Sequence, residues 1–359
     1  MSGDSIDMTK LDGTGTILIV RLFALGDIVL TLPLVRAMRR AFPRSWIGYL
    51  CKRRFAEALA GETGLDEVLP LDTGLAAQAR MIAGLRRRRI DIALDLLGSP
   101  RSALLTRLSG ARTRIGMRTG RRDWYYHRLL PRTIEEDGRR IRCYTLEANL
   151  RLGRILGLPA EPRLEVEAHG FPAAAAERGW AGTYVAGLGE TGEGLVGIVP
   201  GSTYASKSWP EERFIELASV LAREMGLRPI VIWGPGEEDL ARRIAGAVPG
   251  AVMPPPMGIA RVGALIERLR LLVGVDSGPK HIAVLLGVPT VTLFGPTDPE
   301  LWDPMDRLHM AISHRLDCME GCRRRDCAPN ISMQSITVGE VAAAAADMLA
   351  VGAAGKGER

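Results

Sequence analysis

The chain has 359 residues, of which 47% are hydrophobic and 25% charged, so it can bury ordinary cores, and its length favours two domains of typical size. No apolar run reaches the roughly 18 residues that a membrane span needs, and the polar N-terminus lacks the layout of a signal peptide. Five cysteines do not make a disulfide framework in a chain of this length. We therefore expect a soluble cytoplasmic protein. The net charge of +6 does not by itself indicate a class of binding partner.

The first half of the sequence alternates short apolar runs with amphipathic stretches. We expect strands at 17–22, 46–51, 67–71 and 90–97. Helices are expected between them, at 28–42, 53–60 and 75–88, and another helix is expected directly after the strand at 90–97. Strands that are apolar on both faces and separated by helices are typical of a parallel, doubly wound sheet.

This alternation weakens between residues 157 and 190, where Pro, Gly and Ala predominate. We interpret that stretch as a linker, because a second α/β series follows it. Its strands are expected at 195–200, 228–234, 269–276 and 289–295, and its helices near 210–225, 237–247, 259–268, 279–286 and 337–351. The sequence therefore predicts an N-terminal domain at 1–175, a C-terminal domain at 176–335, and a helix and tail at 336–359, for which packing against the N-terminal domain is one option.

Asp27 stands between the first expected strand and a helix expected to begin at Ile28. A helix cap is one explanation, and it would contribute about 1 kcal/mol. Ser, Thr or Asn would cap the helix equally well. The second explanation is chemical, because ligands of open α/β sheets bind beyond the carboxyl ends of the strands.

The segment "GSTYASKSWP" follows the strand expected at 195–200. Gly201 allows a tight turn, and Ser202 and Thr203 offer hydroxyls and amides suited to a phosphate. Lys207 is a cation that can reach the same phosphate. An ordinary loop with an exposed lysine is the alternative.

Two more polar segments follow strands of the second half. In "GPGEEDL", Glu237 and Glu238 can complement a helix dipole or accept hydrogen bonds from a ribose. In "VDSGPKHIA", Asp276 and Ser277 can cap the next helix, and Gly278 permits close approach. That helix N-terminus would suit a diphosphate, and His281 lies in its first turn. Together these strand ends predict a nucleotide-diphosphate pocket, although no G-x-G-x-x-G follows a first strand and no P-loop motif occurs.

Three stretches carry a resemblance to a known family: "RLFALGD", "PGSTYASKSWP" and "GVDSGPKHIAVLLGVPTVTLFGPTDP". In this order they resemble the ADP-heptose:lipopolysaccharide heptosyltransferases, glycosyltransferase family 9, over nearly the whole chain. The resemblance implies the GT-B arrangement, in which two Rossmann-like domains with doubly wound parallel sheets face each other across a cleft. It also implies an inverting glycosyltransferase that needs no metal or other cofactor beyond its nucleotide-sugar co-substrate.

The resemblance also implies roles for individual residues. The general base falls on Asp27, and Lys207 stabilises the departing ADP, as general acid–base and electrostatic catalysis require. The implied donor-binding residues are Ser202, Thr203, Lys207, Glu237, Glu238, Asp276, Ser277, Gly278 and His281. Either Glu237 or Glu238 matches the one carboxylate with which the family binds the adenosine ribose.

The acceptor half departs from the family pattern. Phe23 and Ala24 stand where many members carry serines, and Leu97 replaces the glutamine of an Asp-x-Gln-Gly strand end. The donor half therefore matches better, and the acceptor is left open.

The segment from Gly84 to Arg154 holds 18 Arg, no Lys and 7 acids. A solvated arginine-rich face is one explanation, and a surface for an anionic partner is the other. The resemblance supplies such a partner, an anionic lipopolysaccharide precursor, for which the candidate contacts are Arg53, Arg54, Arg101 and Arg121. The same charge could support a peripheral contact with the inner membrane leaflet. Nucleic acid is not expected, because no recognition module is present.

Cys318, Cys322 and Cys327 lie in one segment near the C-terminus. His314 could complete a Cys₃His zinc set, and Ser332 stands where some relatives carry a fourth cysteine. The cysteine spacing is not that of a standard zinc knuckle, so free thiols are the preferred interpretation.

The sequence as a whole favours heptose transfer from ADP-heptose to the inner core of lipopolysaccharide, with Kdo-lipid A or heptosyl-Kdo-lipid A as acceptor. One alternative keeps the chemistry but uses another acceptor, a protein or other glycan, or another nucleotide-sugar. A second alternative is an inactive nucleotide-sugar-binding protein. A nucleotide-dependent oxidoreductase is disfavoured, because the glycine fingerprint is absent.

Overall fold

The computed structural model divides into two compact units, Met1–Leu164 and Glu165–Arg359. The residues it describes are 14–131, 134–136, 139–155, 157–158, 170–189, 194–316, 327 and 330–356. We expected the boundary at 175/176, later than the structure has it. Gly170 already donates a backbone hydrogen bond to Leu285 (2.7 Å), and the Phe171 ring packs against Gly263, so this segment belongs to the second unit.

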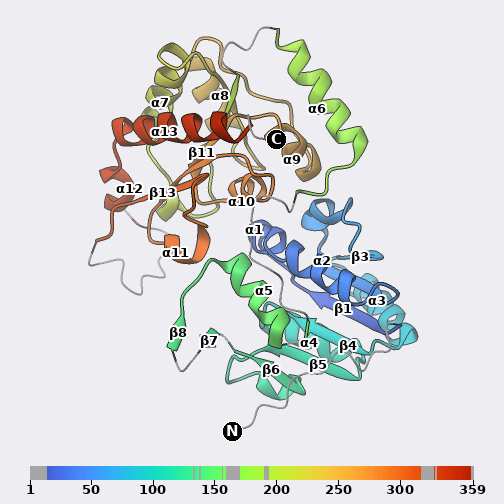
Figure 1. Ribbon diagram of the computed structural model, residues 1–359. Helices are drawn as coiled ribbons and strands as arrows, with labels where there is room; N and C mark the ends of the chain where they lie inside the picture. The colour runs from blue at the N-terminus through green and yellow to red at the C-terminus, as the bar shows by residue number, and fades with distance from the viewer. Residues whose placement is uncertain are drawn as a thin grey trace. The chain divides into compact units, whose positions relative to one another are not determined.

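The first unit is built on a six-stranded sheet with the order β3-β2-β1-β4-β5-β6 (Figure 1). All neighbouring strands are parallel. The strands are β1 (Thr16–Val20), β2 (Trp46–Lys52), β3 (Glu67–Leu71), β4 (Ile92–Asp95), β5 (Thr113–Met117) and β6 (Arg128–Leu130). The strand order reverses between β1 and β4, which is where ligands of doubly wound folds bind.

Helices cover the sheet of the first unit, and α3 and α4 share a core with it in which Leu85 and Leu105 pack near Leu18, Leu50 and Ala93. The helix expected at 28–42 is interrupted at Leu30–Thr31 into two helices, and β5 and β6 were not expected. The remaining elements are α1 (Leu25–Val29), α2 (Leu32–Ala41), η2 (Arg53–Leu59), α3 (Leu75–Arg88), α4 (Pro100–Leu108), η3 (Asp123–Tyr125), β7 (Ile134–Glu136), β8 (Arg139–Ile141) and α5 (Thr145–Ile155).

The second unit is built on a five-stranded parallel sheet with the order β10-β9-β11-β12-β13. The central strands are buried along their whole length because helices lie on both faces (Figure 1). The strand order reverses between β9 and β11. The strands are β9 (Leu195–Val199), β10 (Arg228–Val231), β11 (Leu271–Val275), β12 (Thr290–Phe294) and β13 (His309–Ser313).

One face of this second sheet shares a core with α7, α8 and α13, and α10 packs on β11 and β12. The helix α13 contacts β11, β12, β13 and α7, so it is part of the second unit. This corrects the expectation of a separate terminal segment at 336–359. The helices are α6 (Ala175–Gly187), η5 (Ala205–Lys207), α7 (Glu211–Arg223), α8 (Glu238–Ala247), α9 (Ile259–Ile266), α10 (Gly278–Leu285), α11 (Pro299–Trp302), α12 (Ile331–Ser335) and α13 (Val338–Lys356).

Within the described part of the chain, no helix combines the length and the apolar character needed to cross a bilayer.

Candidate active site

The second sheet brings Lys207 and Asp276 together at its topological switch point. Val199 of β9 is in register with Gly274 of β11, so the segments that follow the two strands start at the same level. Lys207 Nζ lies 2.5 Å from Asp276 Oδ2, although the two residues are 69 positions apart. Their side chains are 15% and 3% exposed. The expectation that these two residues share one sheet edge agrees with this geometry.

The Asp276 carboxylate is a buried anion with several positive neighbours. Burial by itself would raise its pKa, but the charges of Lys207 and Lys280 hold the pKa of Asp276 below its usual value. Thr297 Oγ1 donates a further hydrogen bond to Oδ2 (3.0 Å). Asp276 is therefore ionised at neutral pH, and it fixes the ammonium group of Lys207 rather than capping α10.

The N-terminus of α10 presents Ser277 and Gly278 next to this ion pair. Ser277 is the N-cap residue, but its side chain makes no capping bond. Its Oγ is buried and has no hydrogen-bond partner among the residues described. A buried hydroxyl without a partner is costly, so this hydroxyl is available to a ligand group bound at the helix N-terminus.

His281 lies in the first turn of α10 but is buried, with only 3% of its surface exposed. Its Nε2 is 3.7 Å from Asp276 Oδ1, and its ring meets Trp302 edge-on at 6.1 Å. Burial first, and then the positive charge of Lys280, hold the pKa of His281 well below its usual value. The imidazole is therefore neutral at physiological pH and lies beside the Asp276 carboxylate.

Lys280 is a buried cation that the sequence did not single out. Its Nζ lies 3.0 Å from Asp303 Oδ2, and both side chains are buried; it also donates to the carbonyl of Trp302. These contacts tie α10 to the segment after β12 that carries Thr297. Thr297 was missed as a site residue, although the polar turn "FGPTDP" that contains it was visible in the sequence.

Glu237 packs beside the loop that follows β9. A side chain at position 201 would overlap its carboxylate, so glycine is required there. The Glu237 Oε2 atom also accepts a hydrogen bond from the backbone of Gly234 (2.8 Å). Glu237 is the N-cap residue of α8 and so precedes the helical turn in which it was expected.

Glu238 points to a different place, an open cavity of about 510 Å³ beyond the carboxyl end of β10. Its carboxylate pairs with Arg242 at 2.6 Å. The cavity is lined on other sides by Trp233, Pro256 and Met257, and Trp233 is fixed by a hydrogen bond to the carbonyl of Pro254 (2.9 Å). The lining combines these apolar side chains with the charged groups of Glu238, Asp239 and Arg242, and a concave site with both kinds of group can hold a small molecule. The sequence did not indicate Trp233 or Met257.

Ser202 and Thr203 lie in the same loop as Lys207. Ser202 Oγ accepts a hydrogen bond from the backbone of Tyr204 (3.3 Å), and Thr203 is exposed. The second unit thus gathers eight of the nine expected donor residues around one strand-order reversal, with Glu238 beside the adjoining cavity.

In the first unit, Asp27 lies near the other topological switch point. It is the third residue of α1, not the cap of a helix beginning at Ile28, because α1 begins three residues before Ile28, at Leu25. Its Oδ2 accepts a hydrogen bond from the backbone of Ala24 (3.1 Å), so it does satisfy an N-terminal amide. The side chain is 19% exposed.

Arg21 is the ion-pair partner of Asp27, and sequence reasoning missed it. It follows β1 directly, and its guanidinium also donates to the carbonyl of Leu96 after β4. One arginine therefore links the two strand ends between which the strand order reverses. Its Nε is buried and, within the described ranges, has no hydrogen-bond partner.

Asp95 ends β4 and takes the place of the aspartate in the family's Asp-x-Gln-Gly segment. It accepts hydrogen bonds from Tyr126 Oη (2.7 Å) and from the backbone of Leu97 (2.9 Å) and Gly98 (3.0 Å). Burial raises its pKa. These contacts make Asp95 a structural anchor of the loop that contains Leu97.

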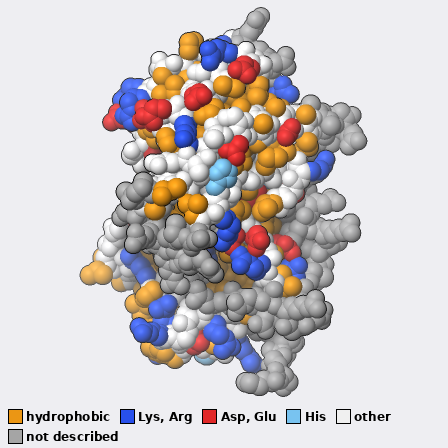
Figure 2. All heavy atoms as spheres, turned by 90° about the vertical axis from the view of Figure 1, so that its left-hand side faces the viewer, with side chains coloured by type: hydrophobic (Ala, Val, Ile, Leu, Met, Phe, Trp, Pro, Cys, Tyr) orange, Lys and Arg blue, Asp and Glu red, His pale blue; other side chains and the backbone are white. Residues whose placement is uncertain are grey.

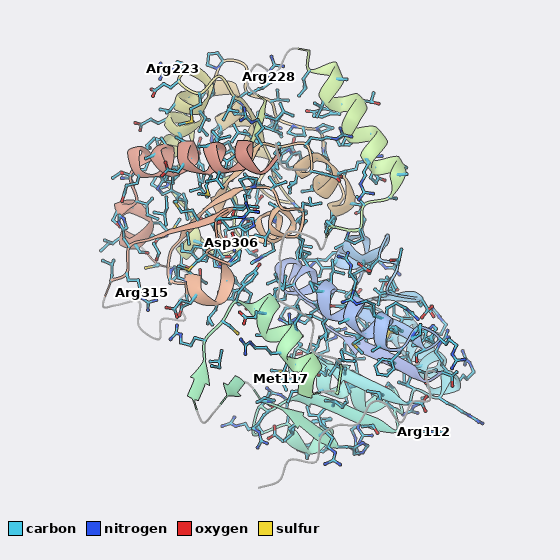
Figure 3. The ribbon with its side chains drawn as sticks, in the orientation of Figure 1. Arg112, Met117, Arg223, Arg228, Asp306 and Arg315 are labelled. Atoms are coloured by element: carbon cyan, nitrogen blue, oxygen red, sulfur yellow. The ribbon has the colours of Figure 1, made fainter. Side chains whose placement is uncertain are left out.

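The four expected acceptor arginines all follow strands of the first sheet. Arg53 and Arg54 begin η2 after β2, Arg101 lies in α4 after β4, and Arg121 follows β5. Figure 3 labels Met117 at the carboxyl end of β5 and Arg112 at the opposite end, so Arg121 emerges on the Met117 side. Basic side chains are visible on the face of the first unit in the lower part of Figure 2.

These arginines differ in their surroundings. Arg53 pairs with Asp72, with Nη2 2.8 Å from Oδ2, and Arg54 lies over the ring of Phe55 at 4.6 Å. Arg101 and Arg121 are exposed.

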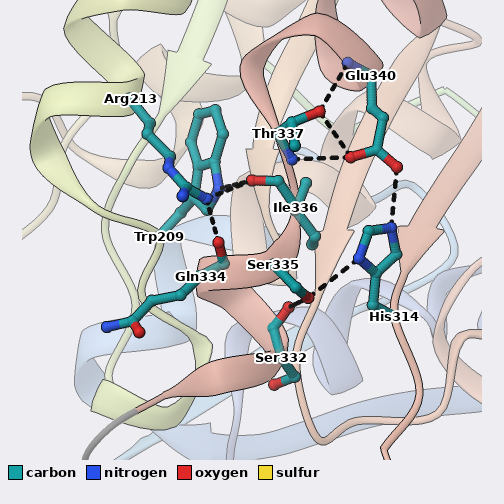
Figure 4. Close-up of polar contacts among 9 residues, drawn as sticks. All are labelled: Trp209, Arg213, His314, Ser332, Gln334, Ser335, Ile336, Thr337 and Glu340. Carbon is teal, nitrogen blue, oxygen red and sulfur yellow. Dashed lines mark hydrogen bonds and ion pairs between the residues drawn. The ribbon is translucent and has the colours of Figure 1, made fainter.

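Cys318 and Cys322 lie outside the described residues, so the zinc alternative is not tested there. His314 is described, and both of its ring nitrogens are engaged (Figure 4). Nδ1 lies 3.0 Å from Ser335 Oγ and Nε2 lies 2.9 Å from Glu340 Oε1. No group of three or more potential metal ligands is found in the part of the chain that the structure describes.

Comparisons with known proteins identify the family. The family model "Glycosyltransferase family 9 (heptosyltransferase)" matches residues 78–331. Lipopolysaccharide heptosyltransferase 1 of Pseudomonas aeruginosa is 25% identical over 329 residues, which cover 87% of each chain. The Escherichia coli K12 enzyme of the same name is 26% identical over 304 residues, covering 79% of this chain and 89% of the relative.

Solved structures show the same fold. A family 9 glycosyltransferase from Veillonella parvula has a TM-score of 0.78 at 20% identity and covers 96% of this chain and 98% of that one. The E. coli heptosyltransferase WaaC with ADP-2-deoxy-2-fluoro heptose has a TM-score of 0.68 at 22% identity and covers 91% and 97%. The E. coli ADP-heptose heptosyltransferase II has a TM-score of 0.74 at 20% identity and covers 94% and 99%. The family model covers well over half of the chain, and the chain is therefore a member of glycosyltransferase family 9, the heptosyltransferases.

Proposed function

We propose that this glycosyltransferase transfers heptose from ADP-heptose to an inner-core acceptor of lipopolysaccharide, Kdo-lipid A or heptosyl-Kdo-lipid A, with inversion at the anomeric carbon. The observation that carries the donor half is the Lys207–Asp276 pair, 2.5 Å apart at the switch point of the second sheet. A phosphate-binding cation is held there beside a free helix N-terminus and a nucleoside-sized cavity.

The donor follows this layout. The base occupies the cavity between Trp233 and Met257, and the diphosphate lies at Lys207, the N-terminus of α10 and the loop containing Ser202 and Thr203. The ribose connects these two sites, which assigns its hydroxyls to Glu237, because that carboxylate lies against Gly201 at the start of the phosphate loop. Glu238 stays at the rim of the cavity with Arg242.

The reaction needs one base and one group that stabilises the leaving phosphate. An acceptor hydroxyl attacks the anomeric carbon and forms a new C–O bond, while the bond to the β-phosphate oxygen of ADP breaks. Asp27 takes the hydroxyl proton, and Arg21 and the Ala24 amide hold its carboxylate in place. Lys207 and the α10 amides stabilise the negative charge that develops on ADP. These groups suffice without a metal in the proposed mechanism.

The acceptor is anionic, and the exposed arginines beyond the first sheet are suited to its carboxylates and phosphates. Arg101 and Arg121 are open to solvent, whereas Arg53 must exchange Asp72 for the acceptor. The proposal places the enzyme in the cytoplasm, with a peripheral contact to the inner leaflet that carries the lipid-anchored acceptor.

The test is release of ADP from ADP-heptose in the presence of heptose-deficient lipopolysaccharide. Release that requires the acceptor, and that is lost in Asp27→Asn while ADP binding persists, would support the proposal. Release that is unaffected by Asp27→Asn would refute the base assignment. Donor binding without turnover on any core acceptor would favour another acceptor or a binding protein, and turnover with another nucleotide-sugar would overturn the donor assignment.

A further inference from the structure

Lys207 lies in a short turn that has few hydrogen bonds of its own. The helix η5 has only three residues, Ala205–Lys207, and its internal bonds run from Lys207 N to Tyr204 O and from Ser208 N to Ala205 O, both 3.0 Å. Short 3₁₀ turns have poor hydrogen-bond geometry. The conformation that aims Lys207 at Asp276 therefore needs support from outside the turn.

That support comes from Asn330, 123 residues further along the chain. Its Nδ2 lies 2.9 Å from the carbonyl oxygen of Ser206 and 3.3 Å from those of Ala205 and Ser208. One amide group thus contacts the backbone on both sides of Lys207. The Asn330 side chain is itself oriented, because its Oδ1 accepts a hydrogen bond from Ser332 Oγ (3.2 Å).

The same C-terminal segment holds the end of the turn. The indole of Trp209 donates to the carbonyl of Ile336 (3.1 Å), and Trp209 is buried. Arg213, in the first turn of α7, donates to the carbonyls of Gln334 and Ile336. Figure 4 shows Trp209 and Arg213 directed at this segment.

The strand β12 closes the other side of the turn. A Cβ atom at Gly295 would lie 2.6 Å from the carbonyl oxygen of Ser206 and 3.2 Å from the Met333 side chain. Glycine at this position therefore lets the Ser206 carbonyl sit between the strand end and the segment that carries Asn330. The carbonyl is fixed by packing on one side and by a hydrogen bond on the other.

We infer that Asn330 is a positioning residue for Lys207: its amide bonds to the backbone of residues 205–208 hold the phosphate-binding lysine in its working conformation. The inference rests on the proposed role of Lys207 at the donor diphosphate. Asn330 touches neither Asp276 nor the site cavity in the contacts described, so it acts through the turn.

Two substitutions test the inference. Asn330→Ala removes the amide, and Asn330→Asp keeps the shape but replaces the donor with a carboxylate that repels the three carbonyls. Thr337→Ala is the matched control, because Thr337 caps α13 through Glu340 (2.7 Å) in the same segment and has no described contact with residues 204–209. Lys207→Met reports the contribution of the lysine itself.

Hydrogen–deuterium exchange gives a readout that does not depend on the donor. We expect exchange at the Lys207 and Ser208 amides to rise by about tenfold or more in Asn330→Ala, and further in Asn330→Asp, because the turn opens more often. Thr337→Ala should leave these two amides unchanged. Unchanged exchange in both Asn330 variants, or an equal increase in Thr337→Ala, would overturn the inference.

ADP binding and turnover then connect the turn to the site. We expect Asn330→Ala to weaken ADP binding and lower kcat by about tenfold, and to add little in a Lys207→Met background, because both changes act on one contact. If Lys207→Met weakens ADP binding but Asn330→Ala raises amide exchange and leaves ADP binding normal, the positioning role of Asn330 is refuted and the proposed role of Lys207 stands. If Lys207→Met leaves ADP binding intact, the proposed function fails at Lys207, and the inference falls with it as a statement about the site.

Discussion

The ion pair between Lys207 and Asp276 makes a prediction about stability that is independent of catalysis. Lys207→Met removes the cation but keeps most of the side-chain volume. Asp276 is 3% exposed, so its charge would remain buried with Thr297 at 3.0 Å as a hydrogen-bond donor. Breaking a buried pair costs about 3–5 kcal/mol, and the remaining partners place this loss near the lower end, about 3 kcal/mol in the free energy of unfolding of the second unit.

This loss should depend on pH, and its direction follows from the lowered pKa of Asp276. A carboxylate whose folded pKa is below its unfolded value stabilises the fold above the unfolded pKa, and this stabilisation is lost as the pH falls through the folded pKa. Without Lys207 the folded pKa rises, so the variant can protonate Asp276 at a pH where the wild type cannot. The difference in stability between the two proteins should therefore be greatest near neutral pH and shrink as the pH falls.

The assay is urea unfolding at about pH 7 and about pH 4.5, in which hydrogen exchange of peptides from β9 and β11 monitors the unfolding of the second unit. Peptide resolution is needed because two units need not unfold together. Lys52→Met in the first unit controls for the loss of one lysine. A Lys207→Met penalty of the same size at both pH values would show that the lost stability does not come from the buried charge of Asp276.

Three further substitutions probe other parts of the site. Asp27→Asn should lower kcat by about 10²–10⁴-fold while the fold and the ADP affinity are retained, and steady-state ADP release would disprove this if turnover stayed near normal. His281→Asn should reduce the loss of stability on acidification: the folded pKa of His281 lies well below its unfolded value, so the histidine destabilises the wild-type fold as the pH falls below about 6.5. Equal acid slopes in the urea midpoints of the two proteins would contradict it. Gly201→Ala would drive a methyl group into the Glu237 carboxylate, and calorimetry should find ADP binding weakened by at least about tenfold; unchanged affinity would mean that Glu237 can move away at no cost to the site.

Much of the fold could be predicted because buried parallel strands are apolar over their whole length. The runs that became β1, β2, β9, β11 and β12 were expected within a few residues of their observed bounds. The helix α6 was missed and assigned to a linker, because its sequence "AAERGWAGTYVAG" is rich in Ala and Gly and buries only Ala181 fully. The strand β5 was missed for a related reason, since "TRIGM" is short and contains an arginine.

The site was predictable where residues directly follow strands and was not where contacts depend on distant segments. Lys207 and Asp276 were both expected at one sheet edge because parallel strands end together. Their pairing at 2.5 Å could not be predicted, because it depends on β9 and β11 being adjacent strands. That adjacency is set by the strand order of the folded sheet. Asn330 carried no signal in the sequence, because its role depends on where α12 and α13 return to the sheet. Arg21 lies in the segment that carries the family resemblance, but its contact with the Leu96 carbonyl depends on a residue that follows another strand.

The position of α13 has a consequence for how the chain is made. Its buried residues Val341, Ala345 and Met348 complete the core over β11 and β12, yet it follows all five strands of that sheet in the sequence. A growing polypeptide can assemble the sheet of the first unit early, whereas the second sheet keeps an open apolar face until α13 leaves the ribosome. During that interval Val273, Val291 and Leu293 are exposed to other chains, so chaperones have most to protect between the synthesis of β13 and that of α13.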